Sequence, residues 1–321
     1  MKAIVHDTYG SPDALELQDV EKPELADDCV LVRVRAAAIN PADWYALTGR
    51  PYVARVQMGL RRPRERAVGV DFAGTVEALG RDVTGFQPGD EVFGGRSGAL
   101  AEYVCVRVAI APKPANLSFE EAAAVPVAAI TALQGLRDKG QLQPGQHVLI
   151  NGASGGVGTF AVQIAKVLGA EVTGVCSTRN VEIARSLGAD HVVDYTREDF
   201  TRSDRRYDLM LDIAGSRSLS ECRRVLTPDA TVVIVGAPKG GAMLGPLSRI
   251  VRLRLGAMRS SQKVVFFIAK LDKPDLEILR ELIEAGKVTP AIDRRYELSE
   301  AADAFRYLEE GHAQGKIVVT V

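Results

Sequence analysis

The sequence has few cysteines, and their spacing argues against a metal site. Four occur in 321 residues, and each lies more than forty positions from the next. No Cys-x-x-Cys pair and no cluster of cysteine with histidine occurs, so a zinc knuckle is not expected and a disulfide framework has no support. We expect buried free thiols, which suit a reducing compartment and a cytoplasmic location. The four are Cys29, Cys105, Cys176 and Cys222.

Long apolar runs and a strong net charge are also missing. The nearest approach to a membrane span, AAAVPVAAITAL, is short and is interrupted by Pro126. The opening residues MKAIVHDTYG contain no apolar stretch of signal-peptide length. The formal net charge is -1, so we expect no general attraction to nucleic acid or to a membrane surface.

Arginine is nevertheless concentrated in two stretches. Residues 54–66, ARVQMGLRRPRER, contain five arginines, and residues 249–259 contain four. A nucleic-acid interface would also need aromatic stacking platforms, and neither stretch has them. We expect solvated faces. Because the first stretch directly follows Tyr52, the alternative is a mobile lid near the mouth of a site.

The order of the strand and helix patterns predicts an α/β chain with two kinds of domain. The first third is rich in β-branched residues separated by Gly, Pro and Asp, which suits a barrel-like β domain. Ser118 and Glu121 form a capping box, which predicts a helix over the alanine-rich residues 118–136. From residue 147 near-continuous apolar strands alternate with helices, as in a parallel sheet covered on both faces. The tail from residue 271 is of mixed character.

A glycine-rich loop, NGASGGVGTF at residues 151–160, follows one apolar strand and opens a helix. Ala153, Gly155 and Gly158 occupy the three glycine positions of G-x-G-x-x-G, with alanine at the first. Gly155 would let the backbone approach a pyrophosphate, and Gly158 would let the helix pack closely on the strand. The helix N-terminus would supply N–H groups to the phosphates. The alternative is a tight turn that binds no ligand.

The segment STRN after the second strand indicates which dinucleotide is bound. An NAD site usually has an acidic residue here to bind the ribose 2′-hydroxyl. Arg179 can instead pair with a 2′-phosphate, and Ser177 and Thr178 can donate hydrogen bonds to its oxygens. This pattern favours NADP(H). The alternative is a solvated loop arginine.

Five motifs occur in order along nearly the whole chain: NPADW, FQPGDEV followed by Phe93, NGASGGVGTFAVQIAK, DYTRED and GHAQGKIVV. Together they resemble the medium-chain dehydrogenase/reductase superfamily, most closely its zinc-free quinone oxidoreductase, or zeta-crystallin, branch. The resemblance implies a Rossmann doubly wound parallel sheet inserted in a GroES-like β-barrel domain. The expected boundaries are 1–120 with 271–321 for the GroES-like domain, and 121–270 for the Rossmann domain.

The resemblance also implies a homodimer and a site without metal. Family members usually pair through the last Rossmann strand, here VVFFI, although a covering helix is the alternative. Zinc-dependent relatives have a cysteine where this chain has AAAINPAD, and Gly-His-Glu where it has Gly69-Val70-Asp71. Without that cysteine and histidine we expect no zinc.

Cofactor contacts are implied by the resemblance along the second domain and the tail. Ser154 to Val157 would bind the pyrophosphate, and Ser177 and Arg179 the 2′-phosphate. Tyr195 would lie near the adenine ribose, or it is simply an aromatic residue at a strand end. The side chains at 265–267 are expected in the core, with their backbone facing the carboxamide. The remaining histidines, at 6, 147 and 191, are interpreted as structural, since none has an acidic partner nearby in sequence. The full set of expected cofactor contacts is Ser154, Gly155, Gly156, Val157, Ser177, Thr178, Arg179, Tyr195, Gly236, Ala237, Val265, Phe266, Phe267, His312, Ala313 and Gln314.

Asn40, Asp43 and Tyr52 are the candidate catalytic residues. Asn40 would hold a ribose or the substrate carbonyl, Tyr52 would donate a proton, and Asp43 is either catalytic or a turn cap. The expected reaction transfers hydride from NADPH to a small electrophile, a quinone or an enone. Two alternatives remain open: a zinc-free NADP-dependent alcohol or aldehyde reductase, and a non-catalytic NADPH-binding protein with a structural, sensing or RNA-binding role.

Overall fold

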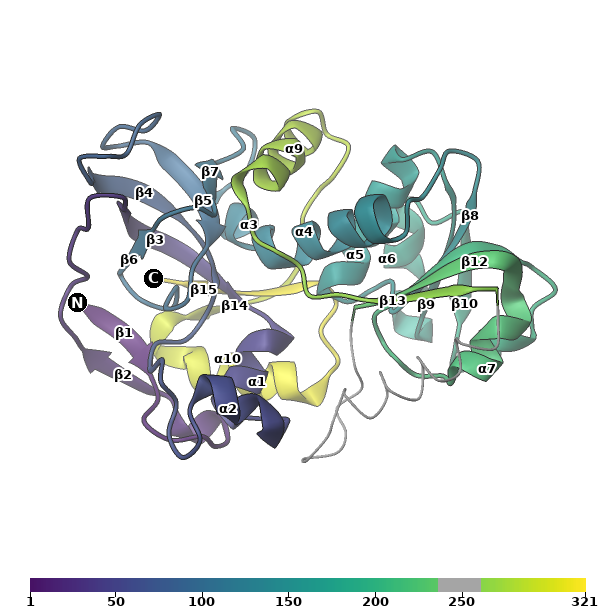
Figure 1. Ribbon diagram of the computed structural model, residues 1–321, viewed down its shortest axis with the longest axis horizontal. Coiled ribbons are helices and arrows are strands. Elements are labelled where there is room, and N and C mark those ends of the chain that lie inside the picture. The colour runs from purple at the N-terminus through teal and green to yellow at the C-terminus, as the bar shows by residue number, and fades with distance from the viewer. Residues whose placement is uncertain (236–260) are drawn as a thin grey trace. The chain divides into compact units, whose positions relative to one another are not determined.

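The computed structural model describes residues 1–235 and 261–321 (Figure 1). The chain divides into two compact units. Unit 1 consists of Met1–Ile130 and Leu271–Val321, and unit 2 of Thr131–Lys270. The first crossing lies inside helix α4 (Pro126–Gln134), later than the expected boundary at residue 120.

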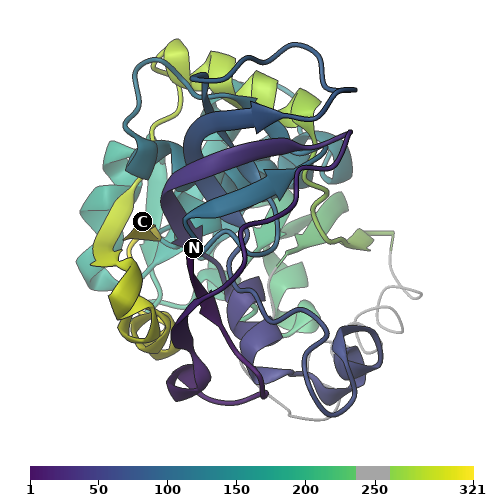
Figure 2. The ribbon, with the colours of Figure 1, turned by 90° about the vertical axis from the view of Figure 1, so that its left-hand side faces the viewer.

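Unit 1 is built on a seven-stranded sheet, which Figure 2 shows from one side. Its strand order is β14-β15-β3-β4-β5-β7, with β6 also paired to β3. Every pair is antiparallel except β14 with β15. The strands are β1 (Lys2–Val5) and β2 (Glu16–Asp19), which form a separate pair, and β3 (Val30–Ile39), β4 (Asp71–Leu79), β5 (Glu91–Gly95), β6 (Tyr103–Val106), β7 (Ile110–Pro112), β14 (Ile292–Glu297) and β15 (Lys316–Thr320). The helices are α1 (Pro41–Thr48), α2 (Arg55–Met58), α3 (Phe119–Ala123), α9 (Lys273–Glu284) and α10 (Ala301–Glu310).

Strand β3 explains how this sheet positions the residues that follow it. Residues 32–35 alternate buried valines with exposed Arg33 and Arg35, the period of a half-buried strand. Residues 36–39 are buried throughout, because β4 and β15 pair with β3 on either side. Small alanines fit this crowded stretch. The strand therefore ends in the core and delivers Asn40 into a buried position.

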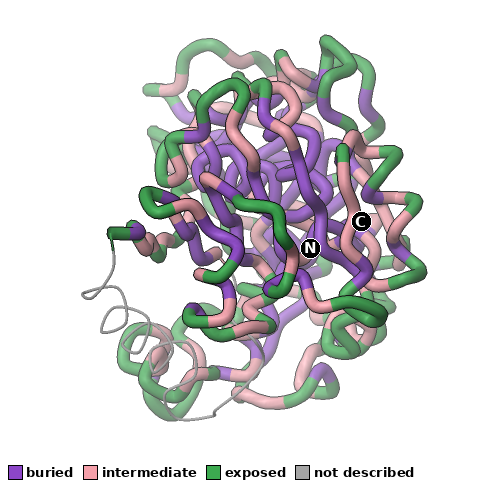
Figure 3. The backbone as a smooth tube through the Cα atoms, turned by 90° about the vertical axis from the view of Figure 1, so that its right-hand side faces the viewer, coloured by how far each residue is buried: buried purple, intermediate pink, exposed green. Residues whose placement is uncertain are grey.

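Unit 2 contains a six-stranded parallel sheet in the order β10-β9-β8-β11-β12-β13 (Figure 1). Its central strands β8 and β11 are buried except at His147 and Asp208. Figure 3 draws the buried parts of the backbone in purple. The predicted alternation of strands and helices is confirmed. The elements are β8 (His147–Asn151), α5 (Gly156–Val167), β9 (Glu171–Cys176), α6 (Val181–Ser186), β10 (His191–Asp194), β11 (Tyr207–Asp212), α7 (Leu219–Cys222), β12 (Leu226–Ile234) and β13 (Lys263–Phe266).

The single helix predicted over residues 118–136 is wrong. The capping box does form, since Glu121 N donates to Ser118 Oγ at 3.2 Å and Ser118 N to Glu121 Oε2 at 2.8 Å. Helix α3 nevertheless stops at Ala123, and α4 begins at Pro126. Proline has no N–H to continue a helix and disfavours helical geometry in the residue before it.

In the described part of the chain, no helix combines the length and the apolar character that a membrane crossing requires.

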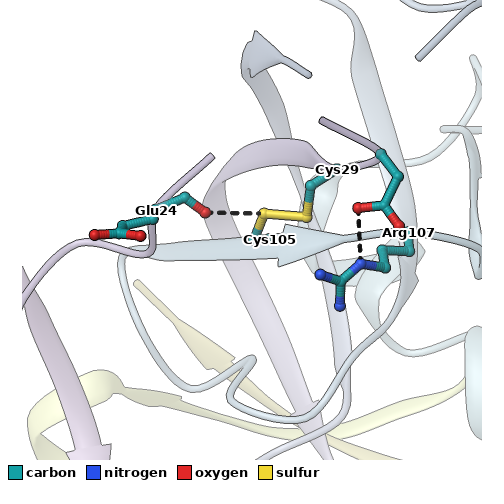
Figure 4. Close-up of a disulfide and its surroundings, with 5 residues drawn as sticks. Glu24, Cys29, Cys105 and Arg107 are labelled. Atoms are coloured by element: carbon teal, nitrogen blue, oxygen red, sulfur yellow. Dashed lines mark hydrogen bonds and ion pairs between the residues drawn. A yellow bond between two sulfur atoms is a disulfide. The ribbon is translucent and has the colours of Figure 1, made fainter. Parts of the chain in front are cut away.

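The expectation of four free thiols is also wrong. Cys29 and Cys105 form a disulfide (Figure 4). Cys176 and Cys222 are buried and form no disulfide, as predicted. Cys29 immediately precedes β3, and Cys105 lies on β6, opposite Leu31 of β3. The antiparallel pairing of these strands joins two residues that are 76 positions apart, which the spacing of cysteines in the sequence does not reveal.

Candidate functional site

The glycine loop starts at the carboxyl end of β8. The neighbours of β8 are β9 on one side and β11 on the other, so the order of strands reverses here. Ligands of doubly wound sheets bind at this kind of switch point. Gly152 begins the turn with φ +99°, and the N–H groups of Gly152 and Ala153 donate to Val175 O at 3.1 and 3.0 Å. The loop is thus fixed to the end of β9.

Two glycines of the loop differ in the space around them. A Cβ on Gly158 would lie 2.0 Å from Gly152 O, so helix α5 approaches the loop more closely than any side chain allows. A Cβ on Gly155 would have no neighbour closer than 3.8 Å. Gly158 is required by packing within the protein, as the motif predicts. Gly155 leaves open space, which is the arrangement needed if a pyrophosphate is to approach the backbone.

The start of helix α5 fits the phosphates of a dinucleotide. Gly155 is the N-cap residue, and no side chain caps the first turn of this twelve-residue helix. Gly156 and Val157 are partly exposed, so their N–H groups remain within reach of a ligand, whereas the Gly155 N–H donates to Gly152 O at 3.3 Å. Ser154 is buried, and its Oγ accepts a hydrogen bond from Asn180 Nδ2 at 2.8 Å.

The segment STRN follows β9 and lies beside the end of β10. Tyr195 N donates to Cys176 O at 3.0 Å, which brings the half-exposed Tyr195 next to Ser177. Thr178 Oγ1 donates to Asp194 Oδ2 at 2.5 Å. Because this bond uses the Thr178 hydroxyl proton, the predicted donation from Thr178 to a 2′-phosphate is not available in this structure. Ser177 is partly exposed and Arg179 is exposed.

In unit 1, Asn40 and Asp43 lie together at the start of helix α1. Asp43 Oδ2 accepts a hydrogen bond from Asn40 N at 2.7 Å, so Asp43 caps the helix. Both side chains are buried. Burial raises the pKa of Asp43 to about 7, and the nearby Asp71 carboxylate acts in the same direction, while the Asn40 N–H and Lys316 oppose it. A carboxyl group in this position is half protonated near neutral pH.

A buried ion pair fixes the side chain of Asn40. Lys316 Nζ donates to Asp71 Oδ2 at 3.0 Å and to Asn40 Oδ1 at 2.6 Å, and Asn40 Nδ2 donates to Asp71 Oδ2 at 3.0 Å. Asp71 Oδ1 accepts from Val127 N, in the first turn of α4, at 2.9 Å. The side chains of Lys316 and Asp71 are only 3% and 0% exposed. Four chain segments therefore meet at one salt bridge.

These residues do not fit a catalytic zinc ion. Zinc is held by thiolate, imidazole or carboxylate groups with free lone pairs. The partners of Asp71 are an ammonium group, an amide and a backbone N–H, and both of its oxygens already accept hydrogen bonds. Across the described ranges, no three His, Cys, Asp or Glu side chains are arranged to hold a metal.

A cavity of about 250 Å³ lies beside Asp43 in unit 1. Its walls come from His6 and Tyr9, which follow strand β1, and from helix α1, residues 67–70 and Ser97. The arginine-rich stretch contributes a further wall through residues 57–58 and 63–65. This stretch is therefore more than a solvated loop: it limits the size of what the cavity can hold. His6 also lines the cavity, and burial lowers the pKa of its imidazole.

Tyr52 is 43% exposed and, like Asn40, does not line the cavity. The Arg55 guanidinium stacks on it at 4.6 Å and on Tyr9 at 4.3 Å. The same guanidinium donates from Nε to Gly49 O at 2.9 Å, at the end of helix α1.

The other predicted contacts are scattered. Gly236 and Ala237 lie outside the described residues, as does the second arginine-rich stretch. The prediction that the side chains at 265–267 lie in the core is wrong: Val265 and Phe267 are only partly buried and Phe266 is 37% exposed. They belong to β13, an edge strand among the described strands, and to its end, where fewer neighbours cover a side chain.

In unit 1, His312 is exposed, Ala313 and Gln314 are partly buried, and Gln314 N donates to Asp293 Oδ2 at 2.8 Å.

Two of the histidines do have an acidic partner. Glu171 at the start of β9 pairs with His191 Nε2 at 3.0 Å and with His147 Nε2 at 3.2 Å. The three residues come from adjacent parallel strands, so strand register brings them together. This acidic partner comes from a neighbouring strand and not from nearby positions in the sequence, and the interpretation of these histidines as structural stays a prediction.

Sequence reasoning missed Lys316, the role of Asp71 and Asn180. Lys316 lies in the motif GHAQGKIVV, where a lysine inside an apolar strand was the available signal, because lysine is almost never fully buried without a partner. In the sequence, Asp71 is visible only as the residue that stands in place of Glu in Gly-His-Glu. Asn180 ends the segment STRN, of which only Ser177, Thr178 and Arg179 were predicted to bind the cofactor.

Comparison with known proteins gives matches along the whole chain. Residues 26–115 match the family described as "Alcohol dehydrogenase GroES-like domain", and residues 187–319 match "Zinc-binding dehydrogenase". The chain is 36% identical to 2-methylene-furan-3-one reductase of Solanum lycopersicum, over 99% of this chain and 79% of that protein. It is 35% identical to NADPH-dependent alkenal/one oxidoreductase, chloroplastic, of Arabidopsis thaliana, with the same coverage. The structure of the quinone oxidoreductase from Coxiella burnetii matches with a TM-score of 0.86 and 32% identity, over 100% of this chain and 99% of that one.

Replacing Lys316 with methionine should destabilise the protein. The uncharged side chain leaves the Asp71 carboxylate buried without its cation, which costs about 3–5 kcal/mol of unfolding free energy. Lys273→Met is the matched control, because that lysine forms an exposed pair with Glu277 and should change stability by about 0.5 kcal/mol or less. Urea denaturation measures both. Equal losses for the two variants would show that the buried pair has no special role.

Alanine at the two loop glycines should separate packing from binding. Gly158→Ala forces a Cβ against Gly152 O and should lower the unfolding free energy by about 1–3 kcal/mol. Gly155→Ala meets no atom closer than 3.8 Å and should cost about 1 kcal/mol or less. It should nevertheless weaken NADPH binding, measured by fluorescence titration, because the methyl group fills the space left for the pyrophosphate. Unchanged NADPH affinity in Gly155→Ala would contradict the assignment of this loop.

Proposed function

The chain belongs to the medium-chain dehydrogenase/reductase family, and from this premise we propose that it is an NADPH-dependent oxidoreductase that reduces a quinone or an enone without zinc. The observation that carries the proposal is the glycine loop at the switch point of the parallel sheet, with open space at Gly155 and uncapped N–H groups at the start of α5. Two relatives whose names specify reduction of enone-type substrates or dependence on NADPH support it. We also propose that units 1 and 2 are the GroES-like and Rossmann domains.

The cofactor is held by unit 2 in this proposal. The backbone of residues 154–157 binds the pyrophosphate, and Ser177 and Arg179 bind the 2′-phosphate. Tyr195 stacks beside them. The other predicted cofactor contacts, including His312, Ala313 and Gln314 of the tail, stay predictions. When bound, NADPH supplies the hydride, and the protein's own groups orient the substrate and handle the proton.

The substrate occupies the cavity beside Asp43. Its volume of about 250 Å³ suits a small quinone or a short enone. Both the arginine-rich stretch and helix α1 line the cavity. Asn40 is held in one orientation by Lys316 and Asp71. It does not line the cavity, so its predicted contact with the substrate carbonyl stays a prediction.

Asp43 is the proton donor we propose for enone reduction. Hydride arrives at the β-carbon, the electron pair of the double bond moves to the α-carbon and the carbonyl oxygen, and the protonated carboxyl of Asp43 gives its proton to the resulting enolate. Water then reprotonates Asp43. Its burial and its pKa near 7 suit this role. Tyr52 is less suitable, since its exposed ring stacks on Arg55 outside the cavity.

A homodimer through β13 is part of the proposal. Among the described strands of unit 2, β13 is an edge strand with a partner on one side only. Val264, Val265 and Phe266 make an apolar edge, which a second copy of the chain would cover. The cytoplasmic location stays a prediction. The Cys29–Cys105 disulfide gives it no support, because disulfides are rare in reducing compartments.

The experiment that tests the function follows NADPH absorbance with purified protein and three acceptors: 1,4-benzoquinone, a short enone and a simple aldehyde. NADPH should be consumed with the quinone or the enone, and NADH should be a poorer reductant. Consumption with the aldehyde alone would select the alcohol or aldehyde reductase. Tight binding of NADPH with no turnover on any acceptor would select the non-catalytic protein.

The pH dependence of enone reduction should report Asp43. Because only its protonated form donates, kcat/KM should be level below pH 7 and fall about tenfold per unit above it. Asp43→Asn keeps an oxygen to accept from Asn40 N but has no acidic proton. It should lower kcat/KM about a hundredfold and remove the fall above pH 7. Asp229→Asn, at an exposed position, is the control. An unchanged profile in Asp43→Asn would assign the proton to another group.

A lysine on the β13 edge should separate the dimer. Phe266→Lys brings two like charges together across the pairing we propose, so the mass by light scattering should fall from about twice 34.5 kDa to the monomer value. Val108→Lys is the control, because Val108 is 65% exposed and belongs to unit 1. A monomeric wild-type protein, or a dimeric Phe266→Lys variant, would contradict pairing through β13.

A further inference from the structure

The side-chain amide of Asn180 is buried, and only one of its two polar atoms forms a hydrogen bond with the residues that the structure describes. Its side chain belongs to a residue that is only 5% exposed. Nδ2 donates to Ser154 Oγ at 2.8 Å, whereas Oδ1 has no hydrogen-bond partner among the residues that the structure describes. Leaving a buried acceptor unpaired costs free energy comparable to a lost hydrogen bond. Such a group needs an explanation.

The usual structural reason for an asparagine here does not apply. Asn180 immediately precedes helix α6, where asparagine commonly accepts a hydrogen bond from an N–H of the first turn. In this protein the side chain makes no such cap. Instead its Nδ2 reaches Ser154 of the glycine loop, so this side chain joins the segment STRN to that loop.

The neighbouring acceptor is already occupied. Asp194 Oδ2 accepts from Thr178 Oγ1 at 2.5 Å. Asp194 Oδ1 accepts from Thr196 N at 3.0 Å and from Thr196 Oγ1 at 2.7 Å. These hydrogen bonds lower the pKa of Asp194, the one from Thr178 most, so it is a carboxylate. Asn180 Oδ1 is thus the acceptor in this group of side chains that still lacks a donor.

The covalent structure of NADP(H) indicates which donor would meet it. The adenosine ribose carries the pyrophosphate on its 5′-oxygen and the extra phosphate on its 2′-oxygen, which leaves the 3′-hydroxyl as its one donor. We assigned these two phosphates to the glycine loop and to STRN. A side chain that bridges the two segments therefore lies along the ribose.

We propose that Asn180 Oδ1 accepts a hydrogen bond from the 3′-hydroxyl of the adenosine ribose, while Nδ2 holds Ser154 in place. The inference rests on the proposed function, because it requires NADP(H) in unit 2. It makes Asn180 a residue that binds the cofactor, and it connects the two phosphate-binding segments through one amide.

The test uses two fragments that differ by one oxygen atom. Calorimetry on the full-length protein measures binding of adenosine 2′,5′-bisphosphate and of its 3′-deoxy analogue. The wild-type protein should bind the analogue about tenfold more weakly, since the buried acceptor stays unpaired in that complex. This comparison needs no change to the protein, so it does not depend on the folding of a variant.

Two variants locate the effect. Asn180→Ala should bind the bisphosphate about tenfold more weakly and should not distinguish it from the 3′-deoxy analogue. Ser154→Ala removes the partner of Nδ2 but keeps Oδ1, so it should bind both fragments more weakly and still prefer the 3′-hydroxyl about tenfold. A merely structural role for Asn180 would weaken both fragments equally and leave their ratio unchanged.

The failures can be told apart. Equal affinity of the wild-type protein for the two fragments, or an undiminished preference in Asn180→Ala, would overturn the role of Asn180 and leave the proposed function standing. No binding of either fragment or of NADPH to the wild-type protein would overturn both.

Discussion

The buried ion pair between Lys316 and Asp71 is the constraint on which unit 1 depends. A lysine and an aspartate without access to water are stable only if each is paired and hydrogen-bonded. Here Lys316 donates to Asp71, Asn40 and, at 3.5 Å, to Ile39 O, while Asp71 receives Lys316, Asn40 and Val127 N. The pair therefore fixes the end of β3, the start of β4, the first turn of α4 and the start of β15 with respect to one another. It also leaves Asn40 a single orientation.

The chemistry proposed for Asp43 follows from the same buried environment. A carboxyl group excluded from water and close to the Asp71 charge keeps its proton to higher pH than an exposed one, and the opposing contacts with Asn40 N and Lys316 limit this effect. In unit 2, a buried side-chain amide holds chain segments together, as the ion pair does in unit 1. Asn180 joins the glycine loop to STRN through Ser154, so the two segments that we propose to bind phosphates are held together. Neither device requires a metal ion.

The features that were predicted correctly are local in the sequence. The parallel sheet was visible in its apolar runs, and the role of Gly158 in a motif of ten residues. Asn40 and Asp43 were singled out by resemblance, and the structure joins them by a hydrogen bond. The pairs that could not be predicted from the sequence are brought together by the pairing of strands that are distant in the chain. Lys316 and Asp71 are 245 positions apart, and Cys29 and Cys105 are 76 positions apart. Pro126 is a local signal for the break between the two helices, but the alanine-rich residues around it favour the prediction of a single helix.

The most direct test of hydride transfer to an activated alkene follows deuterium. NADPH carrying deuterium at the transferable position of its nicotinamide is incubated with the protein and a short enone, and the product is analysed by NMR and mass spectrometry. The account predicts a saturated ketone with deuterium on the former β-carbon and a solvent-derived proton on the α-carbon. An alcohol with deuterium on the former carbonyl carbon, or a product without deuterium, would contradict it.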